Sequence, residues 1–93
     1  MTSGRWRVEI MPSARRDLNR LKPAVASAVL ETIDHIGGAP HRIGKPVRLE
    51  LEGLWTARRG PYRVVYRIEE EDRLVEIVTI DHRSDVYRRA RQG

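Results

Sequence analysis

The alternation of side chains over residues 62–68 constrains the fold of this chain more than any other feature. Successive residues of a strand point to opposite faces of the sheet, and here one set is aromatic or β-branched while the other carries two arginines: Tyr62, Val64, Tyr66 and Ile68 against Arg63, Val65 and Arg67. Such residues favour strands. A strand with one apolar face requires neighbouring strands and a layer packed on that face.

Three more segments predict strands. Residues 5–10 alternate between charged and apolar side chains, residues 74–80 are rich in β-branched residues, and residues 54–59 give a weaker pattern. Gly60-Pro61 and the acidic run Glu69 to Asp72 supply turns on either side of the central strand. A hairpin or meander is therefore the simplest connection.

Two helices are predicted between the first strand and the others. Pro12-Ser13 opens a helix that ends near Lys22-Pro23, and Pro23 opens a second that Gly37-Gly38 stops. Apolar residues recur at helical spacing in both: Ala14, Leu18 and Leu21, then Val25, Val29, Ile33 and Ile36. We expect residues 39–53 to be an ordered connection without a regular element, and residues 85–91 to form a short basic helix.

This order predicts an α+β fold. An N-terminal strand and a helical hairpin would pack on one face of a small, mostly antiparallel sheet, and a short C-terminal helix would end the chain. The opposite face would stay open and would carry Arg63 and Arg67. With 93 residues, the chain is the size of one domain, which we expect to span residues 1–93.

Composition excludes several classes of function. The chain has no cysteine, so disulfides, cysteine-bound zinc and thiol catalysis are excluded. There is no apolar run long enough for a membrane span and no signal-peptide pattern at the start, so we expect a cytoplasmic protein without membrane contact. There is no nucleotide-binding glycine loop, and His35 and His41 lack a third ligand at suitable spacing, so neither a cofactor nor a metal is expected.

The charge points to a polyanionic partner. The chain has 18 Lys plus Arg against 13 Asp plus Glu, a net charge of +5, and a pI of about 10.4. All but Lys22 and Lys45 of these basic residues are arginines, whose planar guanidinium binds phosphate with two hydrogen bonds. The alternative is that the arginine preference reflects genomic composition.

Two stretches in the same order carry a family resemblance. GLWTARRGPYRVVY at residues 53–66 and DHRSDVY at residues 81–87 resemble the RelE/ParE superfamily of type II toxins, most closely the RelE branch. The strand RVEI, the Pro-x-Ala-x-x-Asp-Leu helix start at residues 12–18 and the Gly-Lys-Pro link within residues 39–47 agree with it.

The resemblance implies a toxin that enters the ribosomal A site and cuts messenger RNA without a metal ion. The RNA's own 2′-hydroxyl would attack, leaving a cyclic phosphate and a 5′-hydroxyl. A cognate antitoxin would hold the toxin inactive, and operator DNA would be contacted only through that complex.

The family's catalytic positions fall on Arg63, after the Gly-x-Tyr turn, on Arg83, after the last strand, and on the C-terminal Tyr87. Two basic residues two apart are usual before the turn, and this chain has Thr56 and Arg58 there. Thr56 departs from that pattern, so the general base is left open, and arginine cannot easily take that role because it stays protonated.

Further candidates come from the residues themselves. Histidine is the side chain that most often exchanges protons near neutral pH, so His82 is a candidate general acid. Arg59 is a candidate surface contact to phosphate. Helix arginines would contact ribosomal RNA on either side of the cleft, or simply face solvent: Arg15, Arg16, Arg20, Arg88 and Arg89.

Two other functions remain open on the sequence. The first is a ParE-like inhibitor of DNA gyrase with the same fold and no nuclease activity. The second is a passive nucleic-acid-binding module, for which Thr56 is the only indication.

Overall fold

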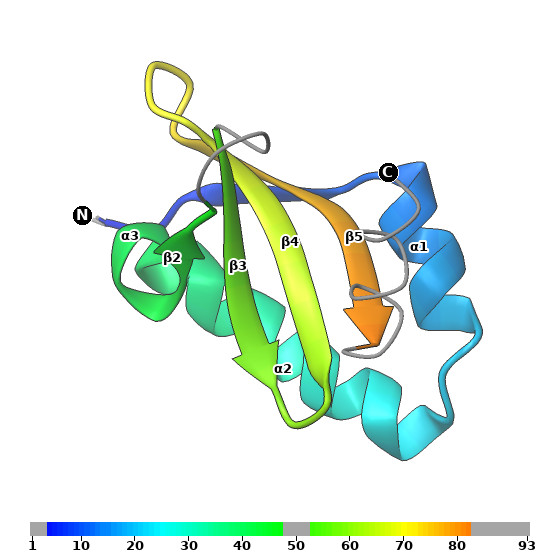
Figure 1. Cartoon of the computed structure of the whole chain (residues 1–93). Helices are drawn as coiled ribbons and strands as arrows, with labels where there is room; N and C mark the ends of the chain where they lie inside the picture. The colour runs from blue at the N-terminus through cyan, green and yellow to red at the C-terminus, as the bar shows by residue number, and fades with distance from the viewer. Residues whose placement is uncertain (1–3, 48–52, 83–93) are drawn as a thin grey trace.

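The computed structural model describes residues 4–47 and 53–82 of the chain. The elements follow in the order β1 (Arg7–Ile10), α1 (Pro12–Asn19), α2 (Pro23–Gly38), α3 (Pro40–Ile43), β2 (Lys45–Pro46), β3 (Leu54–Arg59), β4 (Tyr62–Glu69) and β5 (Leu74–His82). The expected α+β class is confirmed (Figure 1). The predicted helix at residues 85–91 lies outside the described residues.

The strands form one sheet in the order β1-β5-β4-β3-β2. β1 pairs with β5 in parallel, and every other neighbouring pair is antiparallel. In Figure 1, α2 crosses behind the sheet, on the side away from the viewer. The sheet therefore has a core face, which α2 covers, and a second face, which we call the arginine face because it carries Arg58, Arg63 and Arg67 in register.

The core lies between α2 and the sheet, and α1 adds to it. Its buried side chains come from α1 and α2 (Ala14, Val29, Ile33, Ile36) and from β3, β4 and β5 (Ala57, Val64, Tyr66, Val75, Ile77, Ile80). This burial is the main stabilising contribution. The alternation predicted for β4 is thus correct, since Val64 and Tyr66 are fully buried and Arg67 is exposed.

α1 lies along the edge of β5, beyond the point where β1 ends. The Asp17 carboxylate accepts hydrogen bonds from the backbone N–H of Ile80, at 2.8 Å, and from the hydroxyl of Thr79, at 2.7 Å. The Ser13 hydroxyl donates to the carbonyl of Val78. Side chains of α1 thereby satisfy strand groups that β1 leaves without a partner.

A β-bulge in β5 changes which side chains reach each face. Val65 pairs with Thr79 while the next residue, Tyr66, pairs with Ile77, so Val78 is the extra residue. A bulge of this kind shifts the alternation along its strand. If side chains simply alternated from Ile77 onward, Thr79 would lie on the same face as Ile77. Because of the bulge, Thr79 lies on the opposite face, and each later residue of β5 is shifted to the other face in the same way.

The expectation of an irregular connection over residues 39–53 was wrong within the described part of that segment. Pro40–Ile43 form one helical turn, α3, and Lys45–Pro46 form the edge strand β2. Proline is accepted at the start of a helix and on an edge strand, where its missing N–H does no harm. Among the described helices, none is long and apolar enough to cross a membrane.

Candidate active site

The β3–β4 hairpin places two arginines side by side. Arg58 of β3 and Arg63 of β4 are direct partners across the antiparallel pair. The turn between them contains Gly60, whose φ of 59° lies in the left-handed region that glycine adopts without strain. Directly opposed residues of this kind have Cβ atoms about 4.5–5.5 Å apart, so both guanidinium groups reach the same region of the arginine face.

A hollow of about 510 Å³ opens beside this pair. Its described lining consists of Ile43, Gly44, Lys45, Thr56, Ala57, Arg58 and Arg63. The volume falls within the range of about 300–1,000 Å³ that is usual for small-ligand sites. Three of the lining side chains are cations and none is a carboxylate, so the hollow is suited to an anion.

Within the described residues, the cations of the hollow form no ion pair, although Asp81 of β5 is the register partner of Arg63. Ion pairs among the described residues occupy Arg5, Arg20, His41, Arg59 and Arg67. Arg58, Arg63 and Lys45 take part in none of these pairs. Their positive charge is therefore available to an external ligand such as phosphate.

Close packing behind the hollow holds β2 against β3. The buried hydroxyl of Tyr66 donates a hydrogen bond to the carbonyl of Pro40 at 2.6 Å. Burial raises the pKa of Tyr66 to about 12, although a backbone hydrogen bond with Gly44 acts in the opposite direction. A Cβ atom at Gly44 would lie 2.6 Å from the carbonyl oxygen of Thr56 and would collide with the Tyr66 hydroxyl. Glycine at this position is what lets the α3–β2 segment lie so close to β3.

Aromatic rings strengthen the same corner of the molecule. The His41 ring makes edge-to-face contacts with Trp6 and Trp55, both at 5.5 Å between centroids, and its Nε2 lies 2.7 Å from a Glu70 oxygen. Trp6 and Trp55 pack against the core. These contacts tie α3 to Trp55 of β3, to Trp6 and to the β4–β5 turn.

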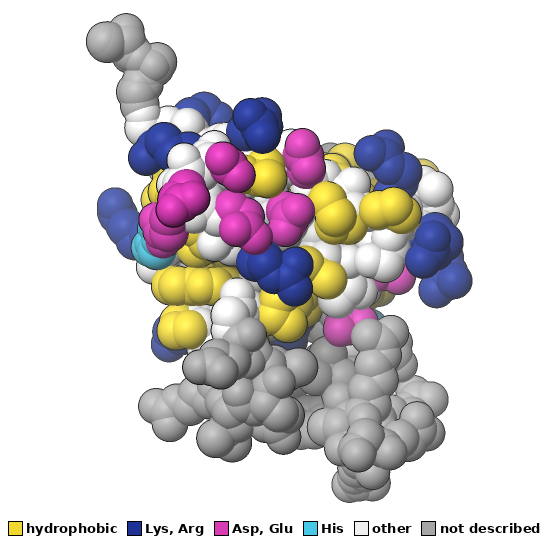
Figure 2. Space-filling view, turned by 90° about the horizontal axis from the view of Figure 1, so that it is seen from above, with side chains coloured by type: hydrophobic (Ala, Val, Ile, Leu, Met, Phe, Trp, Pro, Cys, Tyr) yellow, Lys and Arg dark blue, Asp and Glu magenta, His cyan; other side chains and the backbone are white. Residues whose placement is uncertain are grey.

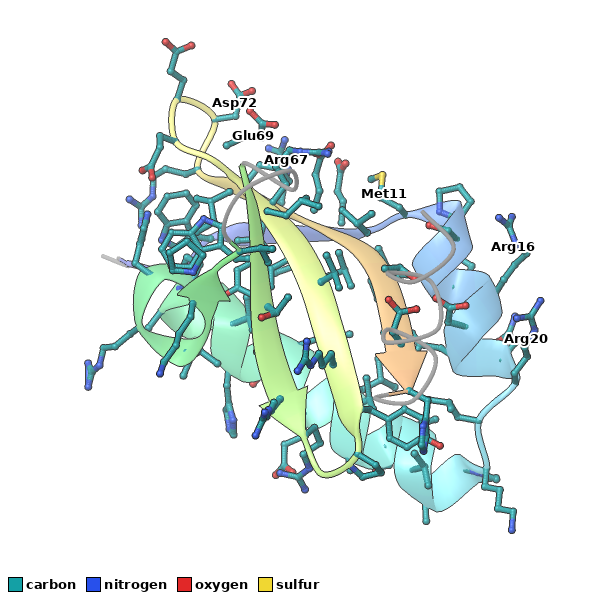
Figure 3. The ribbon with its side chains drawn as sticks, viewed as in Figure 1. Met11, Arg16, Arg20, Arg67, Glu69 and Asp72 are labelled. Atoms are coloured by element: carbon teal, nitrogen blue, oxygen red, sulfur yellow. The ribbon has the colours of Figure 1, made fainter. Side chains whose placement is uncertain are left out.

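The opposite end of the arginine face is acidic. Figure 2 shows Asp and Glu side chains gathered on the end of the molecule that carries the β4–β5 turn. The end of β4 contributes Glu69, and the turn contributes Glu70, Glu71 and Asp72. Figure 3 shows Glu69 and Asp72 at this end together with Arg67, which lies 3.5 Å from Glu76. A polyanion is therefore attracted to the hollow and repelled from the turn.

Two predicted site residues lie away from the hollow. Arg59 follows Arg58 and so points to the core face, where it lies 3.3 Å from Glu31 of α2. His82 is the register partner of Tyr62, and their rings are in edge-to-face contact at 5.1 Å. Because Tyr62 lies on the face opposite to Arg63, the structure does not bring His82 to the arginine pair.

The helix arginines occupy a separate part of the surface. Arg15, Arg16 and Arg20 are exposed on α1. Figure 3 shows Arg16 and Arg20 on the outer side of that helix, beyond β5 and across the sheet from β3. Arg20 lies 4.0 Å from Asp17. They form no part of the hollow.

Four other predicted residues lie outside the described residues: Arg83, Tyr87, Arg88 and Arg89. Lys45 lines the hollow, although it is not among the site residues predicted from the sequence. Its only local signal is the Gly-Lys-Pro link. Its position beside Thr56 depends on a strand pairing that the link does not reveal.

The chain is similar to known toxins over most of its length. Residues 8–87 match the family described as the ParE toxin of the type II toxin-antitoxin system, parDE. The toxin RelG of Mycobacterium tuberculosis is 46% identical over 85 residues, which cover 90% of this chain and 98% of RelG. The toxin RelE of the same organism is 48% identical over 84 residues, covering 89% of this chain and 87% of RelE.

A solved structure agrees with these matches. The toxin-antitoxin complex RelBE2 of M. tuberculosis contains a chain with a TM-score of 0.82 and 42% identity, covering 90% of this chain and 98% of that one. The resemblance expected from the sequence is thereby confirmed. This chain belongs to the ParE toxin family of type II toxin-antitoxin systems and is similar to its RelE-named members.

Proposed function

We propose that this toxin is an endoribonuclease that cleaves messenger RNA in the ribosomal A site and so stops translation. The observation that carries the proposal is the pair Arg58 and Arg63, which lines a hollow without any carboxylate in its described lining. The similarity to toxins named RelE and RelG, at 46–48% identity, supports a RelE-like activity.

The proposed reaction is attack by a 2′-oxygen of the RNA on the adjacent phosphorus. The 2′-hydroxyl loses its proton, the bond from phosphorus to the 5′-oxygen breaks, and that oxygen takes up a proton. Negative charge builds on the non-bridging oxygens, where fixed guanidinium groups stabilise it in the manner of an oxyanion hole. Arg58 and Arg63 supply that stabilisation, and the mechanism requires no protein-bound metal.

The family resemblance assigns two more residues to this reaction. Arg83 adds a third guanidinium, and Tyr87 stacks on a base or assists proton transfer. Arg59 and His82 are left out of the proposed machinery, since their side chains face Glu31 and Tyr62 on the other side of the sheet.

The same cations explain the need for an antitoxin. An acidic, extended partner that covers the arginine face would block the hollow and neutralise its charge. A similar chain of M. tuberculosis was solved in a toxin-antitoxin complex, RelBE2. We propose a cognate antitoxin as the partner of this chain in the cytoplasm, with operator DNA bound only through the complex.

The chemistry of the cut tests the proposal. Purified toxin is added to ribosomes programmed with a short message, and the ends of the products are analysed. We expect a 2′,3′-cyclic phosphate and a 5′-hydroxyl, and no cut where the nucleotide before the scissile bond is 2′-deoxy. An intact message together with inhibition of gyrase supercoiling would favour the alternative function.

A further inference from the structure

In the described lining of the hollow, Lys45 is the cation without a role in the proposed mechanism. It is the first residue of β2 and the direct partner of Thr56 on β3. Partners in an antiparallel pair project to the same face of the sheet. Lys45 and Thr56 therefore share the arginine face with Arg58, two residues further along β3.

The surroundings of Lys45 leave its charge available. Within the described residues, its ammonium is paired with no carboxylate, and Lys45 lines the hollow with Arg58 and Arg63. Three cations around one hollow repel one another. Such an arrangement is stabilised when an anion binds between them.

Several contacts fix the backbone on either side of Lys45. Gly44 packs against the Thr56 carbonyl and the Tyr66 hydroxyl, Tyr66 donates to the carbonyl of Pro40, and the N–H of Val47 donates to the carbonyl of Leu54 at 2.8 Å. These contacts fix the start of the lysine side chain on both sides. A site of this kind is preorganised, which is what charge stabilisation in a transition state requires.

We propose that Lys45 is a catalytic residue of this site, whose ammonium contacts the scissile phosphate opposite the Arg58 and Arg63 pair. The proposal rests on the ribonuclease function proposed above. Lysine acts here as a compact point charge, whereas each arginine offers a planar fork. The phosphate is then held by cations from three strands: β2, β3 and β4.

The test is the single-turnover rate of message cleavage on programmed ribosomes, with toxin in excess. Lys45→Met removes the charge and keeps an unbranched side chain of nearly the same length, and Lys45→Arg keeps the charge. Lys22→Met is the matched control, because Lys22 is the other lysine of the chain and lies exposed before α2. Thermal melting of each variant confirms that it folds.

We expect Lys45→Met to cleave at least about tenfold more slowly than the wild type at saturating toxin. Lys45→Arg should keep most of the rate, and Lys22→Met should match the wild type. If the wild type cleaves and Lys45→Met cleaves equally fast, the role of Lys45 is overturned while the nuclease function stands. If the folded wild type cuts no message, both proposals fall.

Discussion

Arg58 and Arg63 lie directly opposite each other on β3 and β4, although two positive charges at that separation repel. No carboxylate of the described residues forms an ion pair with either one. The nearby Arg67, on the same strand and the same face as Arg63, is paired with Glu76. In the described part of the chain, the sheet thus keeps two neighbouring cations outside any ion pair, and an anionic ligand would offset their mutual repulsion.

Replacing Arg63 should therefore separate stability from activity. Arg63→Gln removes the repulsion with Arg58, so the free energy of unfolding should stay the same or rise by up to about 1 kcal/mol. Loss of one charge-stabilising donor should lower the cleavage rate by about 10²–10³. Urea unfolding and single-turnover cleavage measure the two effects.

Arg67→Gln is the control for that experiment. It removes the same charge from the same strand. Arg67 is paired with Glu76 and does not belong to the described lining of the hollow, so the cleavage rate should stay at the wild-type level. A loss of stability in Arg63→Gln as large as that of a core mutation would contradict this interpretation of the arginine pair.

Most of the sheet could be predicted from the sequence, because the residues of β1 and β4 alternate between apolar and charged or polar side chains and those of β5 are rich in β-branched residues. β2 could not, since its two residues form a strand only through pairing with Trp55 and Thr56. The single turn of α3 likewise depends on contacts from outside, including the hydrogen bond from Tyr66 to Pro40.

Only part of the site could be predicted from the sequence, again because the rest depends on the pairing of strands that are distant in the sequence. The turn motif identified Arg58 and Arg63, whereas Lys45 reaches them through the non-local pairing of β2. Adjacent residues of a strand face opposite ways, which separates Arg59 from Arg58. For His82 the bulge at Val78 decides the face, and no pattern in residues 74–80 indicates that bulge.

Gly44→Ala should destabilise the fold. The new Cβ would meet the Thr56 carbonyl and the Tyr66 hydroxyl, and both are held in place by the sheet and the core. We expect a loss of about 1–3 kcal/mol, as for other overpacked sites, measured by urea unfolding. Gly38→Ala is the control: its nearest neighbour is the end of the Arg5 side chain at 3.6 Å, so stability should hardly change.

Tyr66 should make the fold sensitive to alkaline pH. Burial raises its pKa to about 12, above the value near 10 of an unfolded chain. The folded protein therefore holds this proton more tightly, so the stabilisation is complete below pH 10 and is lost as the pH rises from about 10 to 12. Stability curves for wild type and Tyr66→Phe should differ in this window, the mutant falling less steeply. Parallel curves would contradict the assignment.

Asp17→Ala should weaken the contact between α1 and β5. The substitution leaves the Ile80 N–H and the Thr79 hydroxyl without their acceptor, which costs about 1–3 kcal/mol when the groups are buried. The control is Asp34→Ala, which breaks the exposed pair with Arg5 and should cost less than about 1 kcal/mol. Equal losses in the two variants would show that the edge of β5 does not depend on Asp17.

The central claim is that the arginine pair cuts messenger RNA on the ribosome. Primer extension on a defined message in a translating extract tests it most directly, with wild type, Arg63→Gln and Arg67→Gln compared and ribosome-free RNA included. The account predicts cuts with wild type and Arg67→Gln only when ribosomes are present, and strongly reduced cuts with Arg63→Gln. An uncut message in every sample, or cuts of equal strength with Arg63→Gln, would contradict it.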